Sequence, residues 1–137
     1  MRILGISGSL RRDSYNSMLL RAAAELLPPG AELEVYDGLK AVPPYDADDD
    51  GDFAPAAVVG ASTGMFGAVW AQAETRKILQ TIGARVVDRE LPVSEADERF
   101  PGGRLEDPDL RELYAEILAE VVESARLREE ALAQRAA

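Results

Sequence analysis

The sequence lacks both cysteine and histidine. Without cysteine the chain has no disulfide and no thiolate nucleophile. Without histidine it has no zinc site built on imidazole and no nucleophile–histidine pair. General acid–base catalysis would fall to carboxylates, lysine or tyrosine. Any redox chemistry would therefore have to be carried by a bound cofactor.

Positive charge and long apolar runs are also scarce. The 137 residues include 15 Lys and Arg against 25 Asp and Glu, which gives a formal net charge of −10. Such a chain repels phosphate backbones and anionic bilayers, so nucleic acids and membrane surfaces are poor partners. No apolar run is long enough for a membrane span, and no basic-then-apolar start resembles a signal peptide. We expect a cytoplasmic protein of one domain.

The first part of the chain predicts a strand–helix–strand unit. Residues 2–7 are apolar enough for a short buried parallel strand. Either Ser14 or Asn16 can cap the helix that follows, and Pro28 lies just beyond its last apolar residue. Residues 32–36 alternate between polar and apolar, as a strand at a sheet edge does. This order is the βαβ unit of a doubly wound α/β fold.

The second part of the chain repeats this alternation. A buried strand is predicted at 55–60, a helix at 66–82 and a further strand from 84 to about 92, followed by a polar loop at 94–106. Asp107 before a proline at the first helical position predicts the start of a last helix. We expect the first and last helices on one face of the sheet and the 66–82 helix on the other. The apolar residues of the 66–82 helix share one face: Phe66, Val69, Trp70, Ala73, Ile78 and Ile82.

The loop at residues 5–17, GISGSLRRDSYNS, is richer than a simple connection requires. Serine hydroxyls, amides beside glycine and a helix N-terminus together make an anion site, and Arg11 can add bidentate contacts. The loop matches neither the Walker pattern nor the dinucleotide pattern Gly-x-Gly-x-x-Gly. On spacing alone, a helix cap with spare polar residues explains the loop equally well.

Three segments together resemble a known family. GSLRRDSYNS after the first strand, then PPYDADDD, then VVGASTGMFG are similar to the NAD(P)H-dependent FMN reductases, whose relatives include quinone and chromate reductases. The resemblance implies a flavodoxin-like three-layer sandwich with a parallel sheet, FMN as cofactor and NAD(P)H as co-substrate. It also implies an enzyme that passes hydride from the nicotinamide through FMN to a quinone, flavin or similar small-molecule acceptor.

The same resemblance names the site residues. In that family the first loop wraps the FMN phosphate, and the Gly-Ala-Ser loop approaches the flavin. The resemblance implies no catalytic side chain and no metal ligand. The matching cofactor-binding positions are Ser9, Leu10, Arg11, Ser14, Tyr15, Asn16, Ser62 and Thr63.

The chain departs from the family between these two blocks. Relatives carry there a helix, the central strand, a Pro-Glu-Tyr-Asn loop that contacts the flavin ring, and a further helix. The difference is one βαβ unit or more, roughly 30 to 50 residues. We therefore expect a shortened flavodoxin-like domain over 1–125, shortened between about 53 and 55, with a helical tail over 126–137. Exposed sheet left by the shortening predicts a homo-oligomer.

Two alternatives accompany this interpretation. The chain could be a non-catalytic remnant of the fold that binds an anion or a phosphate-bearing ligand and acts by association with another chain. Separately, residues 46–51 spell the first half of a calcium loop. The twelfth position, where a bidentate glutamate belongs, is Ala57, and we expect a solvated acidic turn without calcium.

Overall fold

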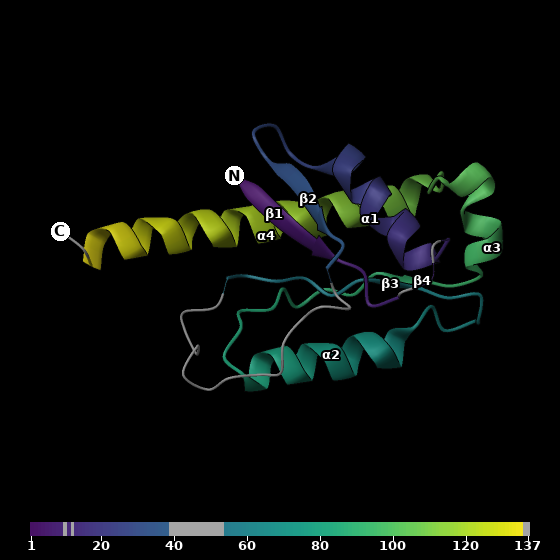
Figure 1. Ribbon diagram of the computed structural model, residues 1–137, viewed down its shortest axis with the longest axis horizontal. Coiled ribbons are helices and arrows are strands. Elements are labelled where there is room, and N and C mark those ends of the chain that lie inside the picture. Colours follow the sequence, from purple (N-terminus) through teal and green to yellow (C-terminus); the bar gives the residue numbers. More distant parts are fainter. Residues whose placement is uncertain (10, 12, 39–53, 136–137) are drawn as a thin grey trace.

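The computed structural model begins with the predicted strand–helix–strand unit (Figure 1). It describes residues 1–9, 11, 13–38 and 54–135. Strand β1 (Arg2–Ile6) leads into helix α1 (Tyr15–Leu26), which returns the chain to strand β2 (Glu32–Tyr36). The two strands are parallel and in register from Arg2 opposite Glu32 to Ile6 opposite Tyr36. This confirms the first part of the prediction, while the acidic segment 46–51 lies outside the described residues.

The second pair of strands is much shorter than predicted. Strands β3 (Gly60–Ala61) and β4 (Pro92–Val93) are parallel, and a lone parallel bridge joins Ala56 to Val86. The prediction of long strands over 55–60 and from 84 to about 92 was therefore wrong. Each segment has a single neighbour in the described part of the chain, and proline cannot donate to a ladder.

The carboxyl-terminal part is more helical than predicted. Helix α3 (Ala96–Arg99), a 3₁₀ turn (Pro101–Gly103) and helix α4 (Pro108–Arg135) follow β4. The prediction of a polar loop over 94–106 was wrong, because Phe100 and Leu105 in this segment are buried. The predicted start of α4 is confirmed. Asp107 Oδ1 accepts hydrogen bonds of 3.1 Å from the amides of the second and third residues beyond it.

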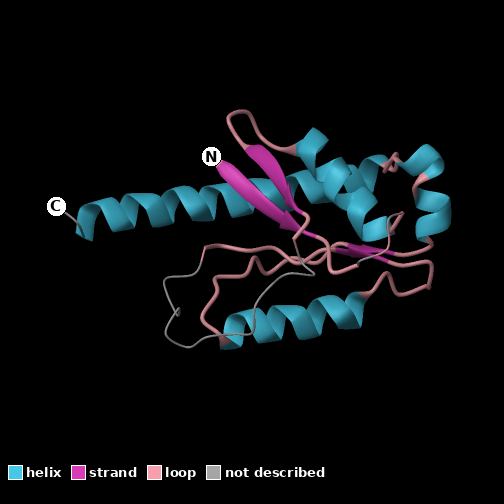
Figure 2. Ribbon diagram, in the orientation of Figure 1, coloured by secondary structure: helices cyan, strands magenta, loops and turns pink. Residues whose placement is uncertain are grey.

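The core lies where α1, α4 and the β3–β4 pair meet. Figure 1 shows α1 and α4 on one side of β3 and β4, with α2 (Val69–Thr81) on the opposite side. Figure 2 shows how little of the chain between these helices is strand. The arrangement is α/β with short parallel strand pairs. The most deeply buried large side chains are Leu19, Leu91, Val93, Leu105, Tyr114 and Ile117.

Helix α2 presents its polar side to the core. Gln72 is buried, where its amide donates to the Gly67 carbonyl oxygen at 3.1 Å and accepts from the Leu91 amide at 3.3 Å. Because both ends of this amide are hydrogen-bonded, its burial is tolerated. The shared apolar face expected to cover the sheet instead points outward, with Trp70 and Ile78 66% and 60% exposed.

The β1–β2 pair is covered on one side. Ile3 and Leu33 lie half-buried on the face that packs against α1, whereas Leu4 and Ile6 on the other face are 56% and 53% exposed. Within the described residues no ladder joins β1 to β3. In the described part of the chain, β1 therefore has an open ladder on its side away from β2.

Burial of Tyr114 predicts a loss of stability at alkaline pH. Burial raises the pKa of its phenol well above the usual value near 10. Above about pH 10 the unfolded chain releases the phenol proton while the folded chain keeps it. The free energy of unfolding therefore falls as pH rises, by up to about 1.4 kcal/mol per pH unit. Urea unfolding between pH 8 and 11 measures the slope. Tyr114→Phe should remove this component, whereas Tyr36→Phe, at an exposed tyrosine, should leave it.

Gly67 cannot carry a side chain. Its φ is +53°, and an added Cβ would lie 2.5 Å from the Pro92 carbonyl carbon and 2.8 Å from the Ser94 amide. Gly67→Ala therefore combines about 1–2 kcal/mol of backbone strain with a collision against fixed backbone. Gly102→Ala is the matched control, since its φ is +60° and its Cβ would meet nothing. We expect a clearly larger drop in the unfolding free energy for Gly67→Ala, and equal drops would contradict this.

Candidate functional site

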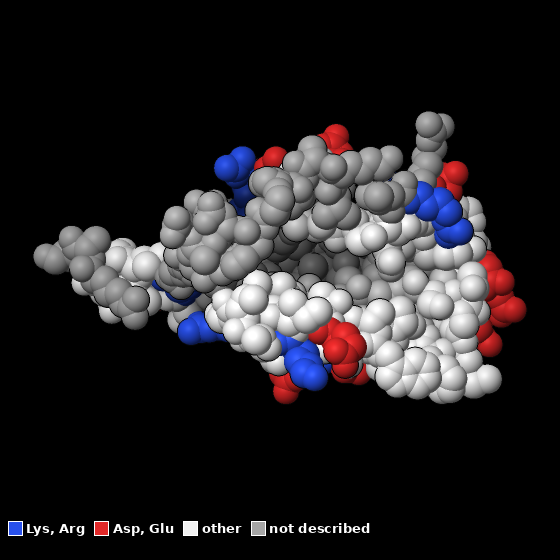
Figure 3. All heavy atoms as spheres, turned by 60° about the horizontal axis from the view of Figure 1, so that its bottom comes forward, with Lys and Arg blue, Asp and Glu red and all other residues white. Residues whose placement is uncertain are grey.

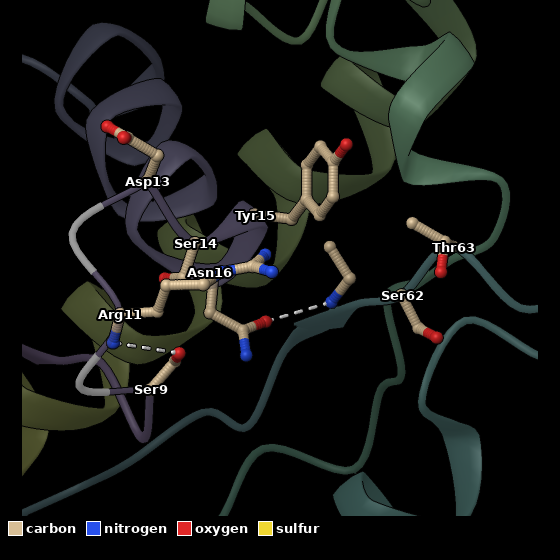
Figure 4. Close-up of a pocket in the computed structure, with 9 residues that line it drawn as sticks. Ser9, Arg11, Asp13, Ser14, Tyr15, Asn16, Ser62 and Thr63 are labelled. Carbon is tan, nitrogen blue, oxygen red and sulfur yellow. Dashed lines mark hydrogen bonds between the residues drawn. The ribbon is translucent and has the colours of Figure 1, made fainter.

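Two segments that are distant in sequence line one cavity of about 610 Å³ (Figure 4). One is the loop between β1 and α1 with the start of that helix, and the other is the end of β3 with the residues that follow. A volume of this size lies within the usual range of ligand clefts, roughly 300–1,000 Å³. The lining residues are Ser9, Arg11, Asp13, Ser14, Tyr15, Asn16, Ala61, Ser62 and Thr63.

Serine hydroxyls fix the start of α1. The buried Ser14 caps the helix, because its Oγ accepts from the Ser17 amide at 3.0 Å. The Ser14 and Ser17 hydroxyls are 2.8 Å apart, and Ser17 Oγ donates to Ser7 Oγ at 3.2 Å. Of the two capping residues that the sequence allowed, the structure selects Ser14. By helix geometry the amides of Tyr15 and Asn16 keep no partner within α1, so they face the ligand side as free donors.

Arg11 supplies positive charge at the edge of the cavity. Its amide donates to Ser9 Oγ at 3.4 Å, and its guanidinium carbon lies 6.0 Å from the centre of the Tyr15 ring. The centre of that ring is in turn 5.9 Å from the ring centre of Phe100, a buried residue directly after α3. Arg11 is exposed and forms no ion pair with any residue that the structure describes. Its charge is therefore available to an anionic ligand.

Asn16 connects the two walls of the cavity. Its Oδ1 accepts a hydrogen bond of 3.0 Å from the Ala61 amide, drawn as a dashed line in Figure 4. The bond joins α1 to β3 across 45 residues of chain. With the oxygen accepting from Ala61, the NH₂ of this side chain is the group that can donate to a ligand.

The second wall is held by backbone hydrogen bonds to neighbouring elements. The Ser62 amide donates to the Val93 carbonyl oxygen at 3.0 Å, and the Ala96 amide donates to the Ser62 carbonyl oxygen at 3.1 Å. Ser62 Oγ accepts from the Gly64 amide at 3.0 Å. Thr63 beside it is exposed. This loop is thus fixed against β4 and the start of α3.

The chemistry of the lining favours an anion such as a phosphate. Free helix amides, hydroxyl groups, an amide NH₂ and a guanidinium are all donors to phosphate oxygens. Asp13 carries the opposite charge, but in Figure 4 its carboxylate points away from the space between Asn16 and Ser62. Among the described residues, no group of three or more Asp and Glu side chains is arranged to hold a metal ion.

Seven of the eight cofactor-binding residues expected from the sequence line this cavity. Leu10 lies outside the described residues, and the binding role of the others stays a prediction. Sequence reasoning missed Asp13 and Ala61. Ala61 contributes its backbone amide, and because every residue except proline has such an amide, the residue type does not reveal this role. Ala61 does belong to the Gly-Ala-Ser segment that the sequence analysis singled out. No helix in the described part of the chain is long and apolar enough to cross a membrane.

Two comparisons with known proteins find similar sequences. Residues 1–54, which include the first wall, match the family described as NADPH-dependent FMN reductase. An NAD(P)H-dependent FMN reductase of Pseudomonas aeruginosa is 29% identical over an alignment of 170 positions, which takes in 86% of this chain and 91% of the relative. The loop before α1 lies inside the matched residues, and the chain is similar to the NADPH-dependent FMN reductases over most of its length.

Proposed function

We propose that this chain is an FMN-binding reductase that uses NAD(P)H and holds the FMN phosphate in the cavity between α1 and β3. The observation that carries the proposal is the cavity itself. It brings the loop before α1 together with the Ser62 and Thr63 segment, although about 45 residues of sequence separate them. Similarity to the NADPH-dependent FMN reductases supports FMN as the cofactor and NAD(P)H as the co-substrate. It does not favour the alternative of a remnant without redox function.

The first wall would bind the phosphate. The Ser9 hydroxyl, the Arg11 guanidinium, the Asn16 NH₂ and the free amides at the start of α1 surround one region of the cavity. The positive end of the helix dipole adds to the attraction. Each of these groups is a donor, which fits a dianionic phosphate better than a neutral ligand.

The second wall would face the flavin. Ser62 and Thr63 offer hydroxyl groups on a loop fixed by β4 and α3. When bound, FMN supplies the two-electron redox chemistry, and the protein binds and orients it. The side chains here hold the cofactor without donating a proton, which agrees with a chain that has no histidine and no cysteine. The acceptor that we propose is a quinone, a flavin or a similar small molecule.

The domain is proposed to be a flavodoxin-like three-layer sandwich shortened at its centre. The alignment with the Pseudomonas relative spans 170 positions, at least 33 more than the 137 residues that the chain has in all. The open ladder between β1 and β3 lies where a further strand would fit. Both observations support a missing central segment. Without the Pro-Glu-Tyr-Asn loop of relatives, one wall for the flavin ring is lost while the phosphate site remains.

Self-association and a cytoplasmic location complete the proposal. The uncovered face of the β1–β2 pair exposes Leu4, Ile6 and part of Tyr36. Exposed apolar surface of this kind is commonly buried between subunits. We therefore propose a homo-oligomer.

Activity measurements test the function. Purified protein should bind FMN, seen as quenching of flavin fluorescence, and should oxidise NADPH in the presence of a quinone. We expect weaker binding and slower turnover than for the Pseudomonas relative assayed beside it, because the flavin ring has fewer contacts. Absence of FMN binding by folded protein would contradict the proposal, and binding without any NADPH oxidation would support the non-catalytic alternative.

Arg11→Ala tests the phosphate site directly. A hydrogen bond to a charged group contributes about 1.5–3 kcal/mol, so FMN affinity should fall roughly ten- to hundredfold. Arg21→Ala is the matched control, since it removes the same charge from an exposed position of α1 outside the cavity. Riboflavin, which lacks the phosphate, should bind both variants equally. Unchanged FMN affinity in folded Arg11→Ala protein would place the site elsewhere.

A further inference from the structure

Ser17 lies outside the cavity but contacts two residues that shape it. It is the third residue of α1 and is half-buried, and it is not among the residues that line the cavity. Its hydroxyl is 2.8 Å from that of Ser14 and donates to Ser7 Oγ at 3.2 Å. Because Ser7 directly follows strand β1, this one hydroxyl joins the first turn of α1 to the end of β1.

The hydrogen bonds among these hydroxyl groups have a single direction. A serine hydroxyl has one proton and two acceptor lone pairs. Because the Ser17 proton goes to Ser7, the bond between Ser14 and Ser17 uses the Ser14 proton. Ser7 Oγ donates in turn to the Ser9 carbonyl oxygen at 3.4 Å and accepts from the Ser9 amide at 3.4 Å. The hydroxyl protons of Ser14, Ser17 and Ser7 are therefore all engaged within the protein.

The Ser9 hydroxyl keeps its proton for a ligand. Its oxygen accepts from the Arg11 amide at 3.4 Å, and it donates to no residue in the part of the chain that the structure describes. Both Ser9 and Ser14 line the cavity. Of these two hydroxyl groups, the one on Ser9 is free to donate to a phosphate oxygen.

Phosphate affinity in an acidic chain depends on donors that are directed at the ligand. The net charge of the chain is −10. On the face drawn in Figure 3, the basic groups lie apart from one another with acidic groups among them. Charges distributed in this way do not concentrate anions over a surface. The orientation of each donor in the cavity matters more as a result, because a hydrogen bond weakens steeply as its angle departs from linear.

We propose that Ser17 is a positioning residue of the phosphate site. Through Ser7, its hydroxyl holds the Ser9 backbone in the position from which the Ser9 hydroxyl donates to the phosphate. Ser7 and Ser17 thus extend the residues that determine FMN affinity beyond those that line the cavity. This deepens the proposed function and rests on it.

The cap of α1 does not need the Ser17 hydroxyl. Ser14 Oγ accepts from the Ser17 backbone amide at 3.0 Å, and an alanine at this position keeps that amide. Alanine also has a higher helix propensity than serine. Ser17→Ala should therefore leave the protein folded while it breaks the connection from α1 to Ser7. Thermal melting verifies the fold of this variant and of those below.

Quenching of flavin fluorescence by the full chain measures the effect of Ser17→Ala. The FMN Kd should rise roughly threefold to tenfold, the effect of losing one neutral hydrogen bond. The riboflavin Kd should stay within about twofold, because riboflavin has no phosphate to lose a contact. Ser17→Thr keeps the hydroxyl, so its FMN Kd should stay within about twofold of that of the unaltered protein.

A double variant tests whether Ser17 acts through Ser7. Ser7→Ala removes the next hydroxyl in the same chain of hydrogen bonds. The FMN Kd of the Ser7→Ala/Ser17→Ala protein should therefore agree with that of Ser7→Ala within about twofold, since substitutions in one network are not additive. A double variant weakened by the product of the two single effects would overturn the inference.

Ser124→Ala is the matched control, because it removes the hydroxyl of another half-buried helical serine, on α4 and outside the cavity lining. It should leave both Kd values unchanged. The inference would be overturned by unchanged FMN affinity in folded Ser17→Ala protein, by an equal loss of FMN and riboflavin affinity, or by Ser17→Thr binding no better than Ser17→Ala. Unaltered protein that binds FMN no more tightly than riboflavin would instead contradict the proposed phosphate site itself, and the inference with it.

Discussion

One hydrogen bond, from the Ala61 amide to Asn16 Oδ1, sets the distance between the two walls of the site. It has this importance because no ladder joins the two strand pairs in the part of the chain that the structure describes. Elsewhere the halves meet through side chains. Glu25 on α1 accepts from Arg104 and Arg111, and apolar contacts bring α1 against α4 in the core. In a continuous sheet, backbone pairing between strands would fix the cavity. Here the Asn16 side-chain amide, the Glu25 carboxylate and apolar packing fix it.

The parts of the fold that could be predicted are those determined by neighbouring residues. The bounds of β2, the cap at Ser14 and the start of α4 at Pro108 follow from local patterning and capping, and so does the serine-rich loop before α1. Strand length could not be predicted for residues 55–60 and 84–92, because it depends on a further neighbouring strand, which is absent from the described part of the chain. Periodicity also shows which residues of α2 share a face, but it does not show whether that face points toward the core or toward solvent. The buried Gln72 decides this, through hydrogen bonds to the backbone of Gly67 and of Leu91, the second of which is 19 residues away.

Electrostatics at the site act against the charge of the whole molecule. The chain carries a net charge of −10 and so repels a dianionic phosphate at long range. Physiological salt screens this repulsion beyond roughly 8 Å. Inside that distance Arg11 and the free amides of α1 dominate, because they lie in the cavity itself. The site is therefore attractive to an anion at contact although the chain as a whole is acidic.

The two walls differ in what holds them, and this bears on how the sequence can vary. The Ser62 wall is positioned largely by backbone groups bonded to Val93 and Ala96. The Ser14 wall is positioned by side-chain hydroxyls, which pass from Ser14 to Ser17 and on to Ser7. Replacing a side chain on the Ser62 wall leaves the backbone path of that wall intact. On the Ser14 wall, by contrast, each serine is needed to keep the start of α1 in place. Related chains should therefore diverge freely around residue 63 and keep the spacing of their serines before the first helix.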